Sequence, residues 1–180
     1  GNLRITLGMT TTTPRIPSAL TIAGSDSCGG AGMQADLKTF TVLGVYGTSV
    51  ITAITAQNTL GVHAAMQLPL ELVQQQFDAV TSDIMPQAIK TGMLASVEMI
   101  ELVAGMISDL QCPYVCDPVM VSKSGHSLIA PEAIATIRQR LFPLARIITP
   151  NRFEVQQLLG RSIGNVEQAA EAARELADMG

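Results

Sequence analysis

The chain has 180 residues, of which 47% are hydrophobic and 14% charged, so it can form a sizeable core and is not a disordered polymer. Its net charge of −4, from 11 Lys and Arg against 15 Asp and Glu, argues against broad binding to nucleic acid or to an anionic membrane. Aromatic residues are at 3%, with no Trp, which disfavours a stacking platform for single-stranded nucleic acid.

Strand-like and helix-like segments alternate along the chain. Apolar runs predict strands at residues 19–23, 45–56, 62–68, 88–90, 114–116 and 146–149, and the run over 45–56 has the composition of a strand buried on both faces. Helices are expected over 31–43 and starting near Pro69, Ser96, Pro131, Asn151 and Asn165. In the helix after Pro69, one apolar face would comprise Val73, Phe77, Val80 and Ile84. The alternation predicts an α/β fold, a mostly parallel sheet with helices on both faces.

The termini and cysteines add little chemistry. Residues 1–18 have no periodicity and are expected to form a flexible arm or to be an expression remnant. No secretory signal is visible, and the three cysteines and two histidines have no zinc-binding spacing, so we expect a cytoplasmic protein.

A glycine-rich loop at residues 24–32 follows the first expected strand and precedes a helix. Its backbone could approach an anionic ligand, or it could be a tight turn that needs small residues. Gly30, Gly32 and Ala35 fit a dinucleotide-binding fingerprint, which would suit an oxidoreductase. That hypothesis is weakened because no carboxylate occurs between Asp36 and Glu71 to hold a ribose. Asp36 could balance the helix dipole or accept hydrogen bonds from a ligand.

Two later strand exits carry carboxylates. Asn151 and Glu154 have the spacing of a helix capping box, but they could also hold a hydrated Mg²⁺ near phosphates. Asp117 begins a turn at another exit, and with Glu154 it would form a two-carboxylate Mg²⁺ site. Lys123 could then neutralise a phosphate.

Five blocks in order carry a family resemblance: LTIAGSDSCGGAGMQADLKTF at 20–40, YGTSVITAITAQN at 46–58, IKTGML at 89–94, CDPVMVSKSG at 116–125, and ITPN at 148–151 with Glu154. They resemble the hydroxymethylpyrimidine/phosphomethylpyrimidine kinases of thiamine biosynthesis, in the ribokinase-like superfamily. The resemblance implies a three-layer ribokinase-like fold, with residues 19–180 as the N-terminal part of the kinase domain and the C-terminal part absent.

The resemblance also implies an activity: ATP-dependent phosphorylation of 4-amino-5-hydroxymethyl-2-methylpyrimidine and then of its monophosphate, with Mg²⁺. The family pattern implies that the pyrimidine lies against Gly24, Asp36, Gln57, Met93 and Val119. It implies that Asp117 and Glu154 lie at the metal and the triphosphate. Asn151 and Lys123 would lie near the phosphates. A homodimer is possible.

One departure limits this inference. The family's downstream Gly-Thr-Gly motif, with its Cys or Asp general base and its anion hole, is not in the sequence. By resemblance that motif would lie beyond Gly180, so no catalytic base is assigned. The chain is therefore expected to be an incomplete, inactive portion of such a kinase. The alternatives are a pyridoxal kinase, which shares part of the pattern, and a non-catalytic module that binds the pyrimidine.

Overall fold

The computed structural model describes residues 16–120 and 131–179. Five strands form one sheet in the order β2-β1-β5-β6-β7, and every neighbouring pair is parallel. The strands are β1 (Ser18–Ala23), β2 (Tyr46–Ile51), β5 (Ala88–Thr91), β6 (Tyr114–Cys116) and β7 (Ile147–Ile148). Because all five run in one direction, their carboxyl ends share one edge of the sheet, where ligands bind in folds of this kind.

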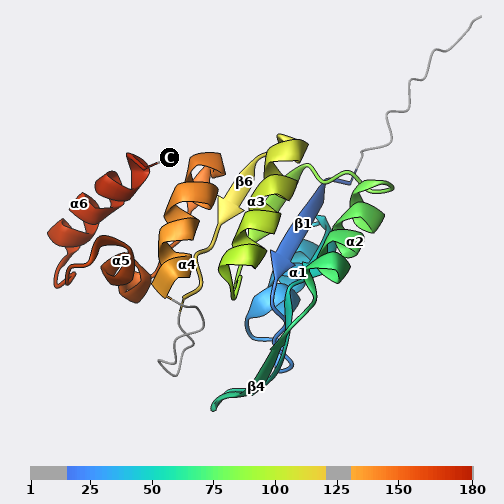
Figure 1. Ribbon diagram of the computed structural model, residues 1–180, viewed down its shortest axis with the longest axis horizontal. Helices are drawn as coiled ribbons and strands as arrows, with labels where there is room; N and C mark the ends of the chain where they lie inside the picture. The colour runs from blue at the N-terminus through green and yellow to red at the C-terminus, as the bar shows by residue number, and fades with distance from the viewer. Residues whose placement is uncertain (1–15, 121–130, 180) are drawn as a thin grey trace, which may run out of the picture.

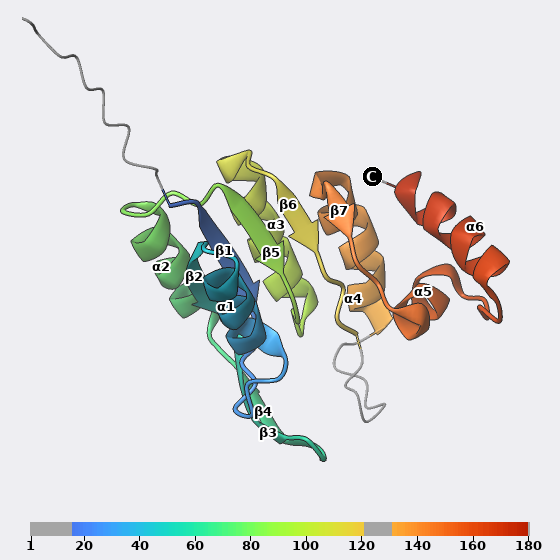
Figure 2. The same cartoon turned by 180° about the vertical axis from the view of Figure 1, so that it is seen from behind.

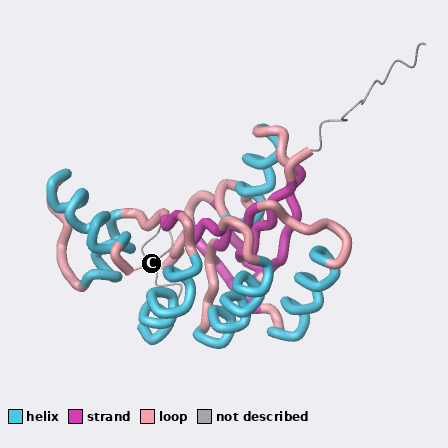
Figure 3. The backbone as a smooth tube through the Cα atoms, turned by 90° about the horizontal axis from the view of Figure 1, so that it is seen from above, coloured by secondary structure: helices cyan, strands magenta, loops and turns pink. Residues whose placement is uncertain are grey.

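Helices cover both faces of the sheet, as predicted (Figures 1 and 2). One layer contains α2 (Leu70–Thr81), α3 (Val97–Leu110) and α4 (Pro131–Thr136), which continues into a π-helical turn (Ile137–Leu141) and a 3₁₀ turn (Phe142–Leu144). On the opposite face, α1 (Gly32–Val42) packs on β1 and β2. The view from above shows that α5 (Arg152–Leu159) and α6 (Val166–Ala177) extend the molecule beyond β7 (Figure 3).

The core lies between the sheet and the α2–α3–α4 layer. Leu20 and Ile22 of β1, Ile89 of β5, and Met99 and Val103 of α3 are all at most 1% exposed. On the other face, Gly47 lets α1 approach β2, since a Cβ there would lie 2.7 Å from Leu37 Cδ2. Within the described residues, no helix is both long enough and apolar enough to cross a membrane.

Several predicted helix boundaries are confirmed. The Ser96 hydroxyl caps α3 by accepting a hydrogen bond from the Met99 N–H. Val73 and Phe77 of α2 are buried, as their spacing predicts. The prediction that Ile84 lies on the same helical face is wrong, because α2 ends at Thr81.

The single buried strand predicted over residues 45–56 is also wrong. The chain forms β2, leaves the sheet at Thr52, and continues as β3 (Ala53–Asn58). With β4 (Gly61–Gln67), β3 forms a separate antiparallel hairpin. Residues of β3 alternate between buried and exposed up to Ala56, and most of β4 is exposed, so this uncharged stretch is not buried on both faces.

Candidate functional site

A cavity of about 590 Å³ lies where β1, β5 and β6 end, and the β3–β4 hairpin forms part of its wall. Eight of the nine residues that the sequence singled out line it: Gly24, Asp36, Gln57, Met93, Asp117, Val119, Asn151 and Glu154. The ninth, Lys123, lies outside the described residues. Residues from six separate segments of the chain thus meet at one cavity.

None of these residues is assigned as the general base. The family resemblance predicts that the base lies beyond Gly180, the last residue of the sequence, and Gly180 itself lies outside the described residues. The position of the base therefore stays a prediction. The cavity is a candidate binding site, and no catalytic residue is assigned in it.

The glycine-rich loop is organised by a carboxylate that the sequence pattern did not single out. Asp26, only 4% exposed, accepts hydrogen bonds from the backbone N–H groups of Cys28 at 2.9 Å, Gly30 at 3.0 Å and Ala31 at 2.8 Å. These N–H groups, from the loop and from Ala31 just before α1, are therefore already occupied. The hydrogen bonds favour the tight-turn interpretation of the loop.

Two serines of the same loop hold the hairpin beside it. Ser27 Oγ donates to the Gln57 carbonyl at 2.7 Å and accepts from the Gln57 N–H at 2.8 Å. Ser25 Oγ accepts from the Thr55 N–H at 3.1 Å, while Thr55 Oγ1 donates to the Ser25 carbonyl at 2.7 Å. These bonds fix the backbone of Gln57, so its side-chain amide is presented from an anchored strand.

In the apolar part of the cavity a glycine packs against a methionine. A Cβ at Gly24 would lie 2.5 Å from Met93 Cε, so a larger residue there would displace the end of the methionine side chain. The Met93 carbonyl accepts a hydrogen bond from Thr52 Oγ1 at 3.0 Å, which ties it to the point where the chain leaves the sheet. Val119 follows a tight turn in which its N–H donates to the Asp117 carbonyl at 2.9 Å.

Asp36 is a member of an ion-pair network. It lies beyond the first turn of α1, so the helix-dipole interpretation is not supported. Its carboxylate accepts a hydrogen bond from Thr21 Oγ1 at 2.6 Å and pairs with Lys90 Nζ at 3.0 Å. The same Nζ lies 3.2 Å from Asp117 Oδ2. Burial opposes the charge on Lys90, but Asp36 and then Asp117 outweigh it and raise the lysine pKa.

Glu154 is both a capping residue and a cavity residue. It forms the predicted capping box: the Asn151 side chain accepts from the Glu154 N–H at 3.1 Å, and Glu154 Oε2 accepts from the Asn151 N–H at 2.8 Å. Glu154 is 2% exposed, and this burial raises the pKa of its carboxyl group; the nearby charge of Asp117 raises it further. The capping and metal-binding interpretations remain compatible.

The donor chemistry suits a hard cation only in part. Carboxylate oxygens from Asp117 and Glu154 are ligands that Mg²⁺ accepts. Among the described residues, however, no group of three or more His, Cys, Asp or Glu side chains could hold a metal ion. Two carboxylates fit a cation that keeps most of its waters or shares oxygens of a bound phosphate.

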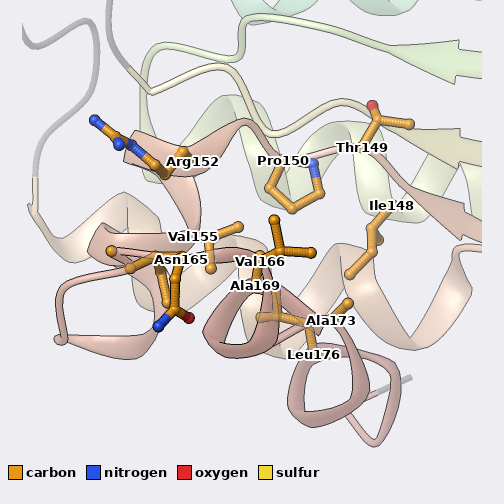
Figure 4. A pocket seen from close by; sticks show the side chains of 12 residues that line it. Ile148, Thr149, Pro150, Arg152, Val155, Asn165, Val166, Ala169, Ala173 and Leu176 are labelled. Carbon is orange, nitrogen blue, oxygen red and sulfur yellow. The ribbon is translucent and has the colours of Figure 1, made fainter. Parts of the chain in front are cut away.

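A second cavity, of about 520 Å³, lies between the end of β7 and helices α5 and α6. Figure 4 shows its largely apolar wall, with Ile148, Val155, Val166 and Ala173 facing one another across it. Arg152 and Asn165 lie at its margin (Figure 4). It holds none of the carboxylates that the sequence singled out.

The parallel sheet with helices on both faces and a cavity at its strand ends is shared with solved ribokinase-like kinases, and the chain has a fold of that class. The phosphomethylpyrimidine kinase family model matches residues 26–180. The chain belongs to that family.

Individual relatives agree with this assignment. A hydroxymethylpyrimidine/phosphomethylpyrimidine kinase of Synechococcus elongatus is 53% identical over 165 residues, which are 92% of this chain and 63% of the relative. The crystal structure of phosphomethylpyrimidine kinase from Clostridium difficile matches with a TM-score of 0.84 at 48% identity, covering 91% of this chain and 71% of that one. A pyridoxal kinase from Staphylococcus aureus, solved with pyridoxal, matches with a TM-score of 0.84 at 38% identity, covering 92% and 62%.

Proposed function

We propose that this chain carries the pyrimidine-binding and metal-binding side of an ATP-dependent hydroxymethylpyrimidine/phosphomethylpyrimidine kinase, with residues 19–180 as part of the kinase domain. The observation that carries the proposal is the convergence of eight predicted residues on one cavity at the carboxyl ends of the strands. The chain spans 63% of the length of the Synechococcus relative, so the reaction is proposed for the whole enzyme.

The substrate side is formed by Gly24, Asp36, Gln57, Met93 and Val119. Gln57 offers both a donor and an acceptor to the edge of an aminopyrimidine, and Asp36 accepts from its amino group. Met93 and Val119 pack against the ring. These contacts orient the hydroxymethyl group, and orientation is a large part of what phosphoryl transfer requires.

The phosphate side is formed by Asp117, Glu154 and Asn151, with Lys123 assigned by resemblance alone. Mg²⁺, when bound, would neutralise charge on the phosphates of ATP. Asp117 and Glu154 would hold it together with water. Such a set is weak for a cation that gives up its waters reluctantly, so binding should depend on the nucleotide phosphates.

Substrate preference tests the proposal. In calorimetric titrations of the 180-residue chain, the hydroxymethylpyrimidine should bind more tightly than pyridoxal. The Gln57→Leu variant should lose about 1–3 kcal/mol of binding free energy, because ring donors and acceptors are left unpaired. Gln75→Leu is the matched control, since Gln75 lies on the exposed face of α2, where its side chain donates to Glu71. Unchanged pyrimidine binding in Gln57→Leu would remove Gln57 from the site.

Pyridoxal kinase is the second candidate, and it is favoured by the 38% identity to the Staphylococcus aureus enzyme. Tighter binding of pyridoxal in the same titration would select it. A module that binds pyrimidine without any catalysis is the third candidate.

We place the protein in the cytoplasm, with a homodimer as a possible assembly and no nucleic-acid or membrane partner.

The 180 residues alone should not turn over ATP. Proton removal from the substrate hydroxyl and charge stabilisation at the γ-phosphate depend on the family's Gly-Thr-Gly motif, which the sequence lacks. Purified chain should therefore release no ADP above a buffer blank when the pyrimidine is added. Sustained release that Cys28→Ala abolishes would contradict this prediction and make Cys28 the base.

A further inference from the structure

Lys90 has an unusual position in the site cavity. Among the described residues that line the cavity, it is the only one with a positively charged side chain, whereas Asp26, Asp36, Asp117 and Glu154 all contribute carboxylates. The Asp26 carboxylate is occupied by three backbone N–H groups of the glycine-rich loop. Lys90 is therefore the one cationic side chain in the described lining that can balance the remaining three.

The lysine joins the two sides of the proposed site. Its Nζ lies 3.0 Å from Asp36 Oδ1, on the pyrimidine side, and 3.2 Å from Asp117 Oδ2, on the metal side. The side chains of Lys90, Asp36 and Asp117 are 25%, 12% and 29% exposed, respectively, so water screens these pairs only in part. Lys90 lies in β5, Asp36 in α1 and Asp117 just after β6, so the fold fixes their spacing.

We propose that the Lys90 ammonium is a built-in counter-ion that occupies Asp117 until a divalent cation arrives and thereafter pairs with Asp36 alone. The inference rests on the proposed metal role of Asp117. It makes Lys90 a positioning residue, which acts through two carboxylates.

The electrostatic consequence is competition. A divalent cation that approaches Asp117 meets an ammonium within ion-pair distance, so it must displace that ammonium and is repelled by it. The cavity then binds the metal weakly unless phosphates bring additional negative charge. The charge of Lys90 thus explains why Mg²⁺ binding to the two carboxylates would depend on a bound nucleotide.

Binding of Mn²⁺, followed by electron paramagnetic resonance in the 180-residue chain without nucleotide, tests the proposal. Lys90→Met should bind Mn²⁺ roughly tenfold more tightly than the wild type, since one repelling charge has been removed. Lys90→Arg, which keeps the charge, should bind Mn²⁺ as weakly as the wild type. Lys38→Met is the matched control and should not change Mn²⁺ binding, because Lys38 Nζ donates to the Gly29 carbonyl and Lys38 is not among the described residues that line the cavity.

The site of the gain is checked with a double variant. Lys90→Met combined with Asp117→Asn should lose the added affinity. If Lys90→Met folds, as judged by circular dichroism, and binds Mn²⁺ no more tightly than the wild type, the proposal is overturned. It is also overturned if the gain persists in the double variant, since the metal would then bind elsewhere.

A measurement on the wild type covers the case in which Lys90→Met does not fold. In protein labelled with ¹³C at the lysine Cε, the Lys90 signal is assigned by its absence from the Lys90→Arg variant. Mg²⁺ should shift this signal over the range of concentrations in which the metal binds. The Lys38 signal should stay in place. A Lys90 signal that does not move while the metal binds would contradict the displacement.

These experiments need no pyrimidine. If Lys90→Met does not bind Mn²⁺ more tightly while the pyrimidine binds as expected, the counter-ion role is wrong and the proposed function stands. If Lys90→Met binds Mn²⁺ more tightly but the pyrimidine does not bind, the proposed pyrimidine site is wrong and the counter-ion role stands.

Discussion

One carboxylate, Asp26, determines what the glycine-rich loop can do. Three backbone N–H groups point at it, so the loop is folded around an internal anion and offers a rigid wall to the cavity. Gly32, at φ +58°, takes a left-handed conformation in which a Cβ would lie 2.5 Å from the Gly24 carbonyl. The glycines therefore serve the close packing of the loop.

Asp26→Asn should destabilise the fold. The new amide keeps one oxygen as an acceptor but turns N–H donors toward backbone N–H groups, so charge-assisted hydrogen bonds are lost. Loss of each such bond should lower the free energy of unfolding by about 1.5–3 kcal/mol. Urea unfolding measures this. Asp83→Asn, at an exposed aspartate after α2, is the control and should change little. Equal effects of the two substitutions would refute the internal-anion role.

Residues that face the cavity can be predicted from the sequence better than the residues that support them. The sequence blocks that carry the family resemblance include Asp36, Gln57 and Asp117, and the last of these blocks is followed by Glu154. Lys90 is inside one of those motifs but receives no role from it, because its partner Asp36 is 54 positions away. A lysine in the middle of a short apolar strand is the available signal, since an ammonium there needs a carboxylate partner.

Among the elements, the order of strands and helices along the chain was predictable from the sequence. The division of one apolar stretch into β2 and β3 was not. Residues 45–56 are uniformly apolar or Thr-rich, which gives no sign that the chain leaves the sheet. In the structure Thr52 marks the break: its N–H still donates to Ala23, while its carbonyl accepts from the Leu68 N–H at the end of the hairpin. Only the tertiary hydrogen bonds distinguish β2 from β3.

The hairpin has a functional consequence. Because β3 leaves the main sheet, Gln57 reaches the cavity from the hairpin and not from the end of a strand of the parallel sheet. Hydrogen bonds of Ser25 and Ser27 join the glycine-rich loop to β3. The loop and the hairpin thus form one wall of the site.

At the scale of the whole molecule, a parallel sheet explains why motifs spread over the chain meet. Strand exits after β1, β5, β6 and β7 lie along one edge, so Gly24, Met93, Asp117 and Asn151 share a cavity. The alternation of elements predicted this convergence. It did not predict the order β2-β1-β5-β6-β7, because several orders bury the same apolar residues.

The described part of the chain contains cavities of about 590 and 520 Å³, and the pyrimidine is proposed to bind in the first. Mapping of amide chemical shifts in the ¹⁵N-labelled chain during titration with the hydroxymethylpyrimidine tests that assignment most directly. The largest shifts should fall at Gly24, Gln57 and Met93. Shifts concentrated instead at Ile148, Val166 and Ala173, in the apolar cavity beside α6, would contradict it.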